Sequence, residues 1–100
     1  MAGRVRHLVQ HPSGYLWRRR LPEPLARLMG RTHLKRSLAT RDRRVAVRRA
    51  REASARVERL RAEVEQAMSE GRLPTREELT AVLAAFFRDL LEVGERRRDR

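Results

Sequence analysis

Arginine side chains gather in two short runs of the sequence, where they alternate with apolar or aromatic residues. The first run, Ser13 to Pro22, holds three consecutive arginines beside the single tryptophan, and the second, Thr32 to Arg51, leads from an alternating segment into a helical pattern. Clustered cations of this kind favour polyanion partners, with nucleic acid first and an anionic membrane surface second. The chemistry that these residues indicate is therefore binding rather than catalysis.

The positive charge is unevenly distributed along the chain. The 100 residues carry a formal net charge of +12. Residues 1–51 hold 15 Lys/Arg against two carboxylates, a balance of +13, whereas residues 52–100 hold 10 against 11, a balance of −1. An arginine-rich codon bias would raise the arginine content of both halves alike. The excess in one half therefore predicts a functional cationic face there.

Eight cations of the first half are the residues expected to bind DNA. They are Arg18, Arg19, Arg20, Lys35, Arg36, Arg43, Arg44 and Arg48. A basic strand face can enter a DNA groove or clamp phosphates, although charge on a strand can also simply protect an exposed sheet edge. Cations at a helix start oppose the helix dipole, so their presence suggests phosphate binding or weak selection against them.

Other chemistry finds little support in the residue types. There is no cysteine, which excludes disulfides and thiolate chemistry. His7, His11 and His33 lack metal-ligand spacing, and no catalytic serine–histidine–aspartate grouping, nucleotide-binding glycine loop or carboxylate pair is present. We expect no catalytic residue, metal, cofactor or small-molecule substrate. No apolar run reaches a membrane span or forms a signal segment, so we expect no membrane partner and a cytoplasmic location.

Three short strands are predicted by residues that alternate in polarity. They cover Arg6–Gln10, Tyr15–Leu21 and Thr32–Ala39. The turn residues of His11–Gly14 predict that the first two strands form a hairpin. Trp17 shares a strand face with Arg19. A lone tryptophan in a small domain is more often core than a stacking platform for bases, so Trp17 is expected in the core.

Three helices are also predicted. They cover Glu23–Met29, Arg43–Glu70 and Thr75–Gly94, and a frayed charged tail, Glu95–Arg100, follows. The long helix carries small or apolar residues at alternating spacings of four and three, at Ala46, Ala50, Ala53, Val57, Leu60, Val64 and Ala67. Thr75 and Glu78 have the spacing of a capping box. The apolar stripe after them should fold back on the long helix, because the connection is short.

These elements predict an α+β fold, with a small three-stranded antiparallel sheet packed on a long helix and followed by a second amphipathic helix. We divide the chain into a DNA-binding domain, residues 1–71, and an amphipathic helix with its charged tail, residues 72–100. From the residues alone, two other functions stay open. One is RNA binding, and the other is a protein-interaction module that uses the long helix and the last helix.

Three segments in the first half follow one another in a recognisable order. They read Gly14-Tyr-Leu-Trp-Arg-Arg-Arg-Leu-Pro22, Leu34-x-Arg36-Ser37-Leu38-x-Thr40-x-Asp42, and Ala46 with Arg49-Ala50. Together, over about residues 7–70, they resemble the N-terminal region of phage-type tyrosine recombinases (integrases). The sequence departs from that family at Ala39, where the family usually has glycine.

The resemblance implies an arm-type DNA-binding domain whose sheet enters the major groove. Carried over by position, Arg18, Arg19, Arg20, Lys35 and Arg36 would lie on or beside the DNA-facing sheet, and the helix from Thr75 would begin a core-binding domain. The implied partners are double-stranded DNA and other integrase protomers. The recombinase catalytic domain is missing, so we expect a non-catalytic N-terminal domain or truncated fragment and not an enzyme.

Overall fold

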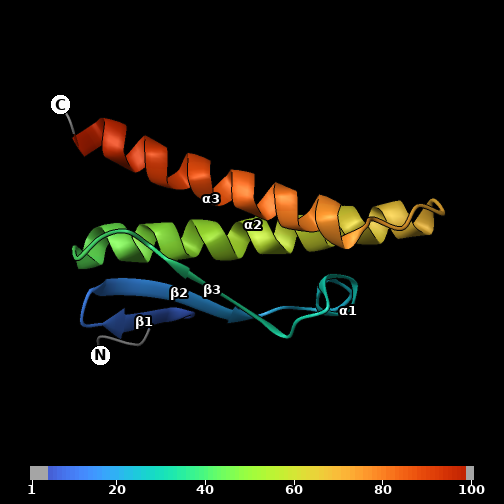
Figure 1. The fold of residues 1–100 in the computed structure, drawn as a ribbon, viewed down its shortest axis with the longest axis horizontal. Coiled ribbons are helices and arrows are strands. Elements are labelled where there is room, and N and C mark those ends of the chain that lie inside the picture. The colour runs from blue at the N-terminus through green and yellow to red at the C-terminus, as the bar shows by residue number, and fades with distance from the viewer. Residues whose placement is uncertain (1–4, 99–100) are drawn as a thin grey trace.

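The chain forms a small sheet and three helices, in a computed structural model that describes residues 5–98, with side chains to Glu92 (Figure 1). The elements in order are β1 (Leu8–His11), β2 (Gly14–Arg20), α1 (Leu25–Met29), β3 (His33–Ser37), α2 (Arg43–Ser69) and α3 (Arg76–Arg98). The α+β prediction is confirmed, with a three-stranded antiparallel sheet on a long helix and a further amphipathic helix after it.

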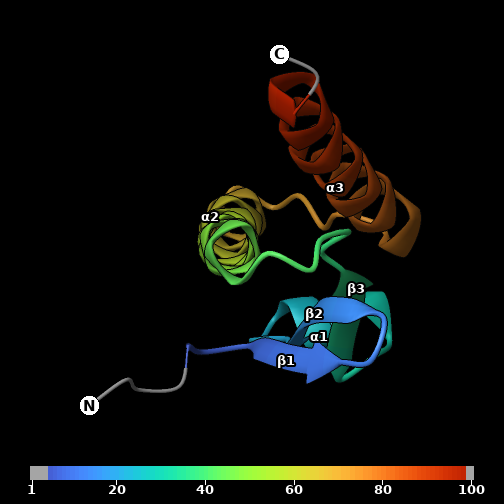
Figure 2. The same cartoon turned by 90° about the vertical axis from the view of Figure 1, so that its left-hand side faces the viewer.

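The sheet has the order β1-β2-β3, and both neighbouring pairs are antiparallel. His11 pairs with Gly14, so the predicted hairpin has a two-residue loop. Trp17 pairs with Leu8 on one side and Arg36 on the other, which sets the register of the whole sheet. Both long helices, α2 and α3, lie on one side of the sheet (Figure 2). The other face is therefore left open by these helices.

The core lies between the sheet and α2. Trp17 is completely buried there, as predicted, and its indole Nε1 donates a hydrogen bond to the Ser54 hydroxyl over 3.0 Å. All seven residues of the predicted 4,3 pattern on α2 are buried: Ala46, Ala50, Ala53, Val57, Leu60, Val64 and Ala67. Three of the alanines, Ala46, Ala50 and Ala53, come first, where α2 passes over the sheet. Their small side chains leave room for the indole between helix and strands.

Helix α3 returns antiparallel to α2 and completes the same core (Figure 1). Leu79, Leu83 and Phe87 are buried in the core cluster that also contains Trp17. The Phe87 ring lies 5.4 Å from the Trp17 ring, between centroids. The predicted capping box is confirmed, since Glu78 N donates to the Thr75 hydroxyl (3.1 Å) and Thr75 N to the Glu78 carboxylate (2.8 Å). The sheet and the last helix thus share one core.

The predicted end of the last helix at Gly94 is wrong. The helical backbone of α3 runs on through Gly94 to Arg98. A glycine ends a helix where its backbone turns left-handed, as Gly30 does after α1 at φ 68°. Inside a helix glycine costs only about 1 kcal/mol relative to alanine, which a long helix can absorb. The end of the predicted charged tail, residues 99–100, lies outside the described residues.

The segment between β3 and α2 is held from two sides. Gly14, at φ 141°, brings the hairpin so close that an added Cβ would lie 2.7 Å from the Thr40 carbonyl oxygen. Tyr15 N donates to that same oxygen over 3.2 Å. From the helix side, the buried Arg49 donates to the carbonyl oxygens of Leu38 (2.6 Å) and Ala39 (3.4 Å). These contacts fix where α2 begins relative to the sheet.

Candidate nucleic-acid interface

The open face of the sheet, on the side away from α2 and α3, carries a cluster of exposed cations. We call this surface the open sheet face and define it by Val9, Leu16, Arg18, Arg20, His33 and Lys35. Arg18 lies directly opposite Lys35, and Arg20 lies directly opposite His33. All four side chains are exposed, and none of the three strands contains an acidic residue.

Cross-strand neighbours of like charge repel one another, because their side chains are only about 5 Å apart at Cβ. The Arg18–Lys35 pair therefore makes the open sheet face less stable than an uncharged pair would. A bound polyanion would remove this repulsion. The arrangement suits phosphate oxygens, which accept hydrogen bonds from both kinds of cation.

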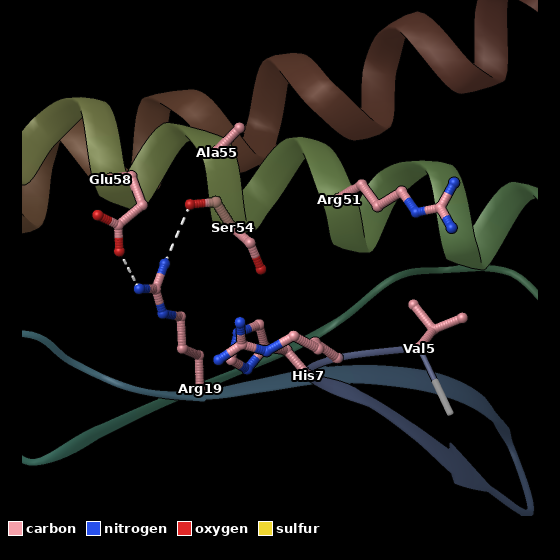
Figure 3. Close-up of a pocket in the computed structure, with 8 residues that line it drawn as sticks. Val5, His7, Arg19, Arg51, Ser54, Ala55 and Glu58 are labelled. Atoms are coloured by element: carbon pink, nitrogen blue, oxygen red, sulfur yellow. Dashed lines mark hydrogen bonds and ion pairs between the residues drawn. The ribbon is translucent and has the colours of Figure 1, made fainter. Parts of the chain in front are cut away.

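Arg19 does not belong to the open sheet face. It shares the covered side of β2 with Trp17, and its guanidinium pairs with the Glu58 carboxylate and donates to the Ser54 carbonyl oxygen over 3.0 Å (Figure 3). Its side chain is 12% exposed. The expectation that Arg19 contacts DNA is corrected for this reason: strand alternation turns it towards α2, where it joins the sheet to the helix.

Arg36 is corrected in the same way. It lies on β3 between the buried Leu34 and Leu38, the residue just after the strand, so its side chain starts from the covered face. Its guanidinium carbon lies 5.7 Å from the centroid of the Phe87 ring, and its Nη1 donates to the Lys35 carbonyl oxygen over 3.0 Å. Such a cation–π contact is stabilising. Arg36 therefore links β3 to α3 rather than adding to the open sheet face.

The three cations expected at the helix start are exposed but lie on a different element. Arg43, Arg44 and Arg48 occupy the first turns of α2, where the Asp42 carboxylate caps the helix by accepting from Arg44 N over 2.9 Å. Helix α2 lies against the opposite side of the sheet from the open sheet face (Figure 2). The eight predicted residues are thus divided among the open sheet face, the core side and the helix start.

His33 belongs to the open sheet face, although it is not among the eight residues expected to bind DNA. It is exposed, and it lies across from Arg20. Strand alternation, which puts His33 on the same side as Lys35, was the signal that could have found it. An imidazole at this position can donate a hydrogen bond to a phosphate in either charge state.

The Arg19–Glu58 contact predicts a pH dependence of stability. Hydrogen bonds from Arg19 and then from Arg61 hold the pKa of Glu58 below its usual value near 4.5. A depressed folded-state pKa means that this stabilisation is present above the unfolded-state pKa and is lost as the pH falls through the folded-state value. We expect Glu58→Gln to lessen the fall in Tm below about pH 5, measured by circular dichroism.

Glu52→Gln is the matched control, because Glu52 is an exposed carboxylate of the same helix and makes no ion pair within the described residues. Its Tm should follow the wild-type pH profile. The effect at Glu58 should be modest, because its side chain is 44% exposed and solvent screens the pair. Equal slopes of Tm against pH for the two variants would show that Glu58 makes no specific contribution to the pH dependence of stability.

Comparison with known proteins places the chain in a family. A family model described as a domain of unknown function (DUF6538) matches residues 7–67, from just before β1 to the last turn of α2. The chain belongs to this family. No curated protein and no solved structure matches the chain.

Two further features bear on the kind of site. Across the part of the chain that the structure describes, no group of three or more His, Cys, Asp or Glu side chains could hold a metal ion. None of the described helices combines the length and the apolar character needed to cross a lipid bilayer. Exposed cations are the chemistry that the open sheet face offers.

Proposed function

We propose that the chain binds double-stranded DNA through the open sheet face, as a non-catalytic N-terminal domain of a tyrosine recombinase. The observation that carries the proposal is the pairing of Arg18 with Lys35 on a face without carboxylates. Phosphate contacts of this kind supply most of the affinity of such domains and make it steeply dependent on salt. The cytoplasm is the proposed location, and other recombinase protomers are proposed neighbours on the DNA.

The shape of the open sheet face supports DNA as the polyanion. Strands of a sheet can enter and read the major groove of B-form DNA, whereas the major groove of an RNA duplex is too narrow for side chains to read. Val9 and Leu16 add an apolar patch to the same face, and Val9 is 41% exposed. Apolar side chains in the major groove can contact thymine methyl groups.

The test is fluorescence anisotropy of a labelled duplex, titrated with the full chain across a series of salt concentrations. Each phosphate contact contributes about 0.9 to the slope of log affinity against log salt concentration. Replacing Arg18, Arg20 and Lys35 together with alanine should therefore lower that slope by about two to three and weaken binding at every salt concentration.

The matched control replaces three exposed arginines away from the sheet, Arg59, Arg72 and Arg88, with alanine. It removes the same net charge, so a purely long-range effect would lower its slope equally. We expect less than half the change seen for the sheet variant. Equal losses in both variants, or no loss in the sheet variant, would refute the open sheet face as the DNA surface. If an unlabelled RNA duplex competes for the chain as well as unlabelled DNA does, RNA binding would be favoured over DNA binding.

The alternative function, a protein-interaction module, has less support. The pattern of small and apolar residues on α2 that could pair with another chain is already buried within this one, at 0–7% exposure. On α3, Phe86 and Leu90 are half-buried against the same core. Light scattering tests this alternative: a molar mass that rises with concentration over the micromolar range would favour it.

A further inference from the structure

A second cationic surface lies on the helix-covered side of the sheet, between α2 and the sheet edge where β1 begins. It is a trough of about 740 Å³ lined by Val5, Arg6, His7, Arg19, Arg51, Ser54, Ala55 and Glu58. Figure 3 shows its two walls, with Arg51, Ser54 and Glu58 on α2 above and Arg19 and His7 on the strand side below. None of the eight predicted DNA-binding residues except Arg19 lines it.

The charges in the trough are not balanced. Glu58, the one carboxylate of the lining, pairs with Arg19 and with Arg61. The side chains of Arg6 and Arg51 make no ion pair or hydrogen bond to any other residue that the structure describes. Two cations from segments far apart in the sequence therefore line the trough, and neither is paired with a carboxylate that the structure describes.

The trough continues a row of cations on α2. Arg44, Arg48 and Arg51 follow one another at spacings of four and three residues, which places them on one side of the helix. All three are exposed. The row spans about 10 Å along the helix axis, at about 1.5 Å per residue. It leads from the helix start into the trough at Arg51.

The electrostatic state of His7 supports an anion site. Burial, and then the charges of Arg19 and Arg6, lower the pKa of His7 below its usual value. Arg51 and Glu58 face the same trough from α2. Because Glu58 is occupied by its arginine partners, the positive charges dominate around the imidazole. An anion that entered the trough would offset them and allow His7 to protonate more readily.

We propose that this trough is a binding site for a phosphate group, with Arg51 and Arg6 as its charged donors and His7 lying on its strand side. The trough is larger than one phosphate, so the group can be free phosphate or one carried by a nucleic-acid strand. The second case rests on the proposed DNA binding and adds a second contact surface to it. The first does not depend on that function.

The test uses the histidine ring resonances of the full chain in a pH titration by nuclear magnetic resonance. The chain has three histidines, and they report different places: His7 the trough, His33 the open sheet face and His11 the hairpin. A His7→Gln variant assigns the His7 signal. The titration is run in chloride, in inorganic phosphate at the same ionic strength, and with a short DNA duplex.

Binding in the trough should raise the pKa of His7. A rise with both probes identifies a site for free phosphate, and a rise with the duplex alone identifies the phosphates of nucleic acid. Arg51→Gln should weaken the binding of whichever probe raises the pKa of His7 by about tenfold, as expected for the loss of one hydrogen bond to a charged group. Arg59→Gln, an exposed arginine of the same helix outside the trough, should leave it unchanged.

The proposal is overturned if neither probe changes the pKa of His7. It is also overturned if Arg51→Gln binds the probe as well as the wild type and the control Arg59→Gln do. The same data separate this site from the proposed function. If the duplex shifts the ring resonances of His33 but not those of His7, the trough is refuted as a phosphate site and the open sheet face is supported as the DNA surface. If His7 responds to free phosphate and the duplex does not bind at all, the phosphate site in the trough is supported and the proposed DNA binding is refuted.

Discussion

Replacing Trp17 with alanine is expected to lower the free energy of unfolding by about 3–5 kcal/mol, the range for deleting a large buried aromatic side chain. Trp17 is completely buried, packs against the Phe87 ring at an interplanar angle of 51° and donates a hydrogen bond to Ser54. A domain of this size has a total stability of about 5–15 kcal/mol, so the variant should be marginal or unfolded. Urea unfolding followed by far-ultraviolet circular dichroism measures the change.

Trp17→Phe is the matched variant. It keeps an aromatic ring between β2, α2 and α3 but removes the indole Nε1 that donates to Ser54 over 3.0 Å. We expect a loss of roughly 1–2 kcal/mol, from the smaller ring and the unpaired hydroxyl. If Trp17→Ala unfolded at the same urea concentration as the wild type, the shared core of sheet and helices would be refuted.

Arg49→Ala should have the second-largest effect on stability, about 2–4 kcal/mol. Arg49 is 3% exposed and donates to the carbonyl oxygens of Leu38 and Ala39. Its removal leaves these acceptors without that donor and opens a cavity under the segment that leads into α2. The same urea titration measures the loss, and Arg49→Lys, which keeps a cationic donor, should recover part of it.

Arg48→Ala provides the control, since Arg48 is the adjacent arginine and is exposed. Its unfolding free energy should stay within about 0.5 kcal/mol of the wild-type value. Similar losses for Arg48→Ala and Arg49→Ala would contradict a specific role for the buried guanidinium. The pair thus distinguishes a structural arginine from a surface one within two consecutive positions.

Residue periodicity was enough to predict the elements and most of the core. The 4,3 spacing on α2 identified all seven of its buried small and apolar residues, and the capping box placed the start of α3. These features are local, because a helix repeats every 3.6 residues whatever it packs against. The end of α3 was missed, because glycine tolerates helical as well as left-handed backbone and its neighbours decide between them.

The candidate site was predicted less well than the fold. Alternation placed Arg19 with Trp17, and Arg36 with Leu34 and Leu38, but it does not state which face of a sheet a helix will cover. Trp17 carried that information: if it is core, Arg19 on the same face must turn inward as well. The partners of the two arginines, Glu58 and Phe87, lie 39 and 51 positions away in the sequence, so no local pattern reveals them.

The trough beside His7 shows the same limit. Its walls come from the segment before β1, from β2 and from the middle of α2, which only the tertiary packing brings together. The row of arginines on α2 could be read from the sequence, but the uncompensated pair of Arg6 and Arg51 could not. Charge counting predicts an anionic partner, and the folded chain is needed to show which cations are already neutralised.

Chemical-shift mapping of a DNA duplex onto the isotope-labelled chain tests directly whether the open sheet face binds DNA. We expect the largest changes on the backbone amides of Arg18, Arg20, His33 and Lys35, at the open sheet face. Amides of Arg59 and Arg88, on the outer surfaces of the two helices, should stay unchanged. Changes confined to the helices, with the amides of β2 and β3 unmoved, would contradict DNA binding by the sheet.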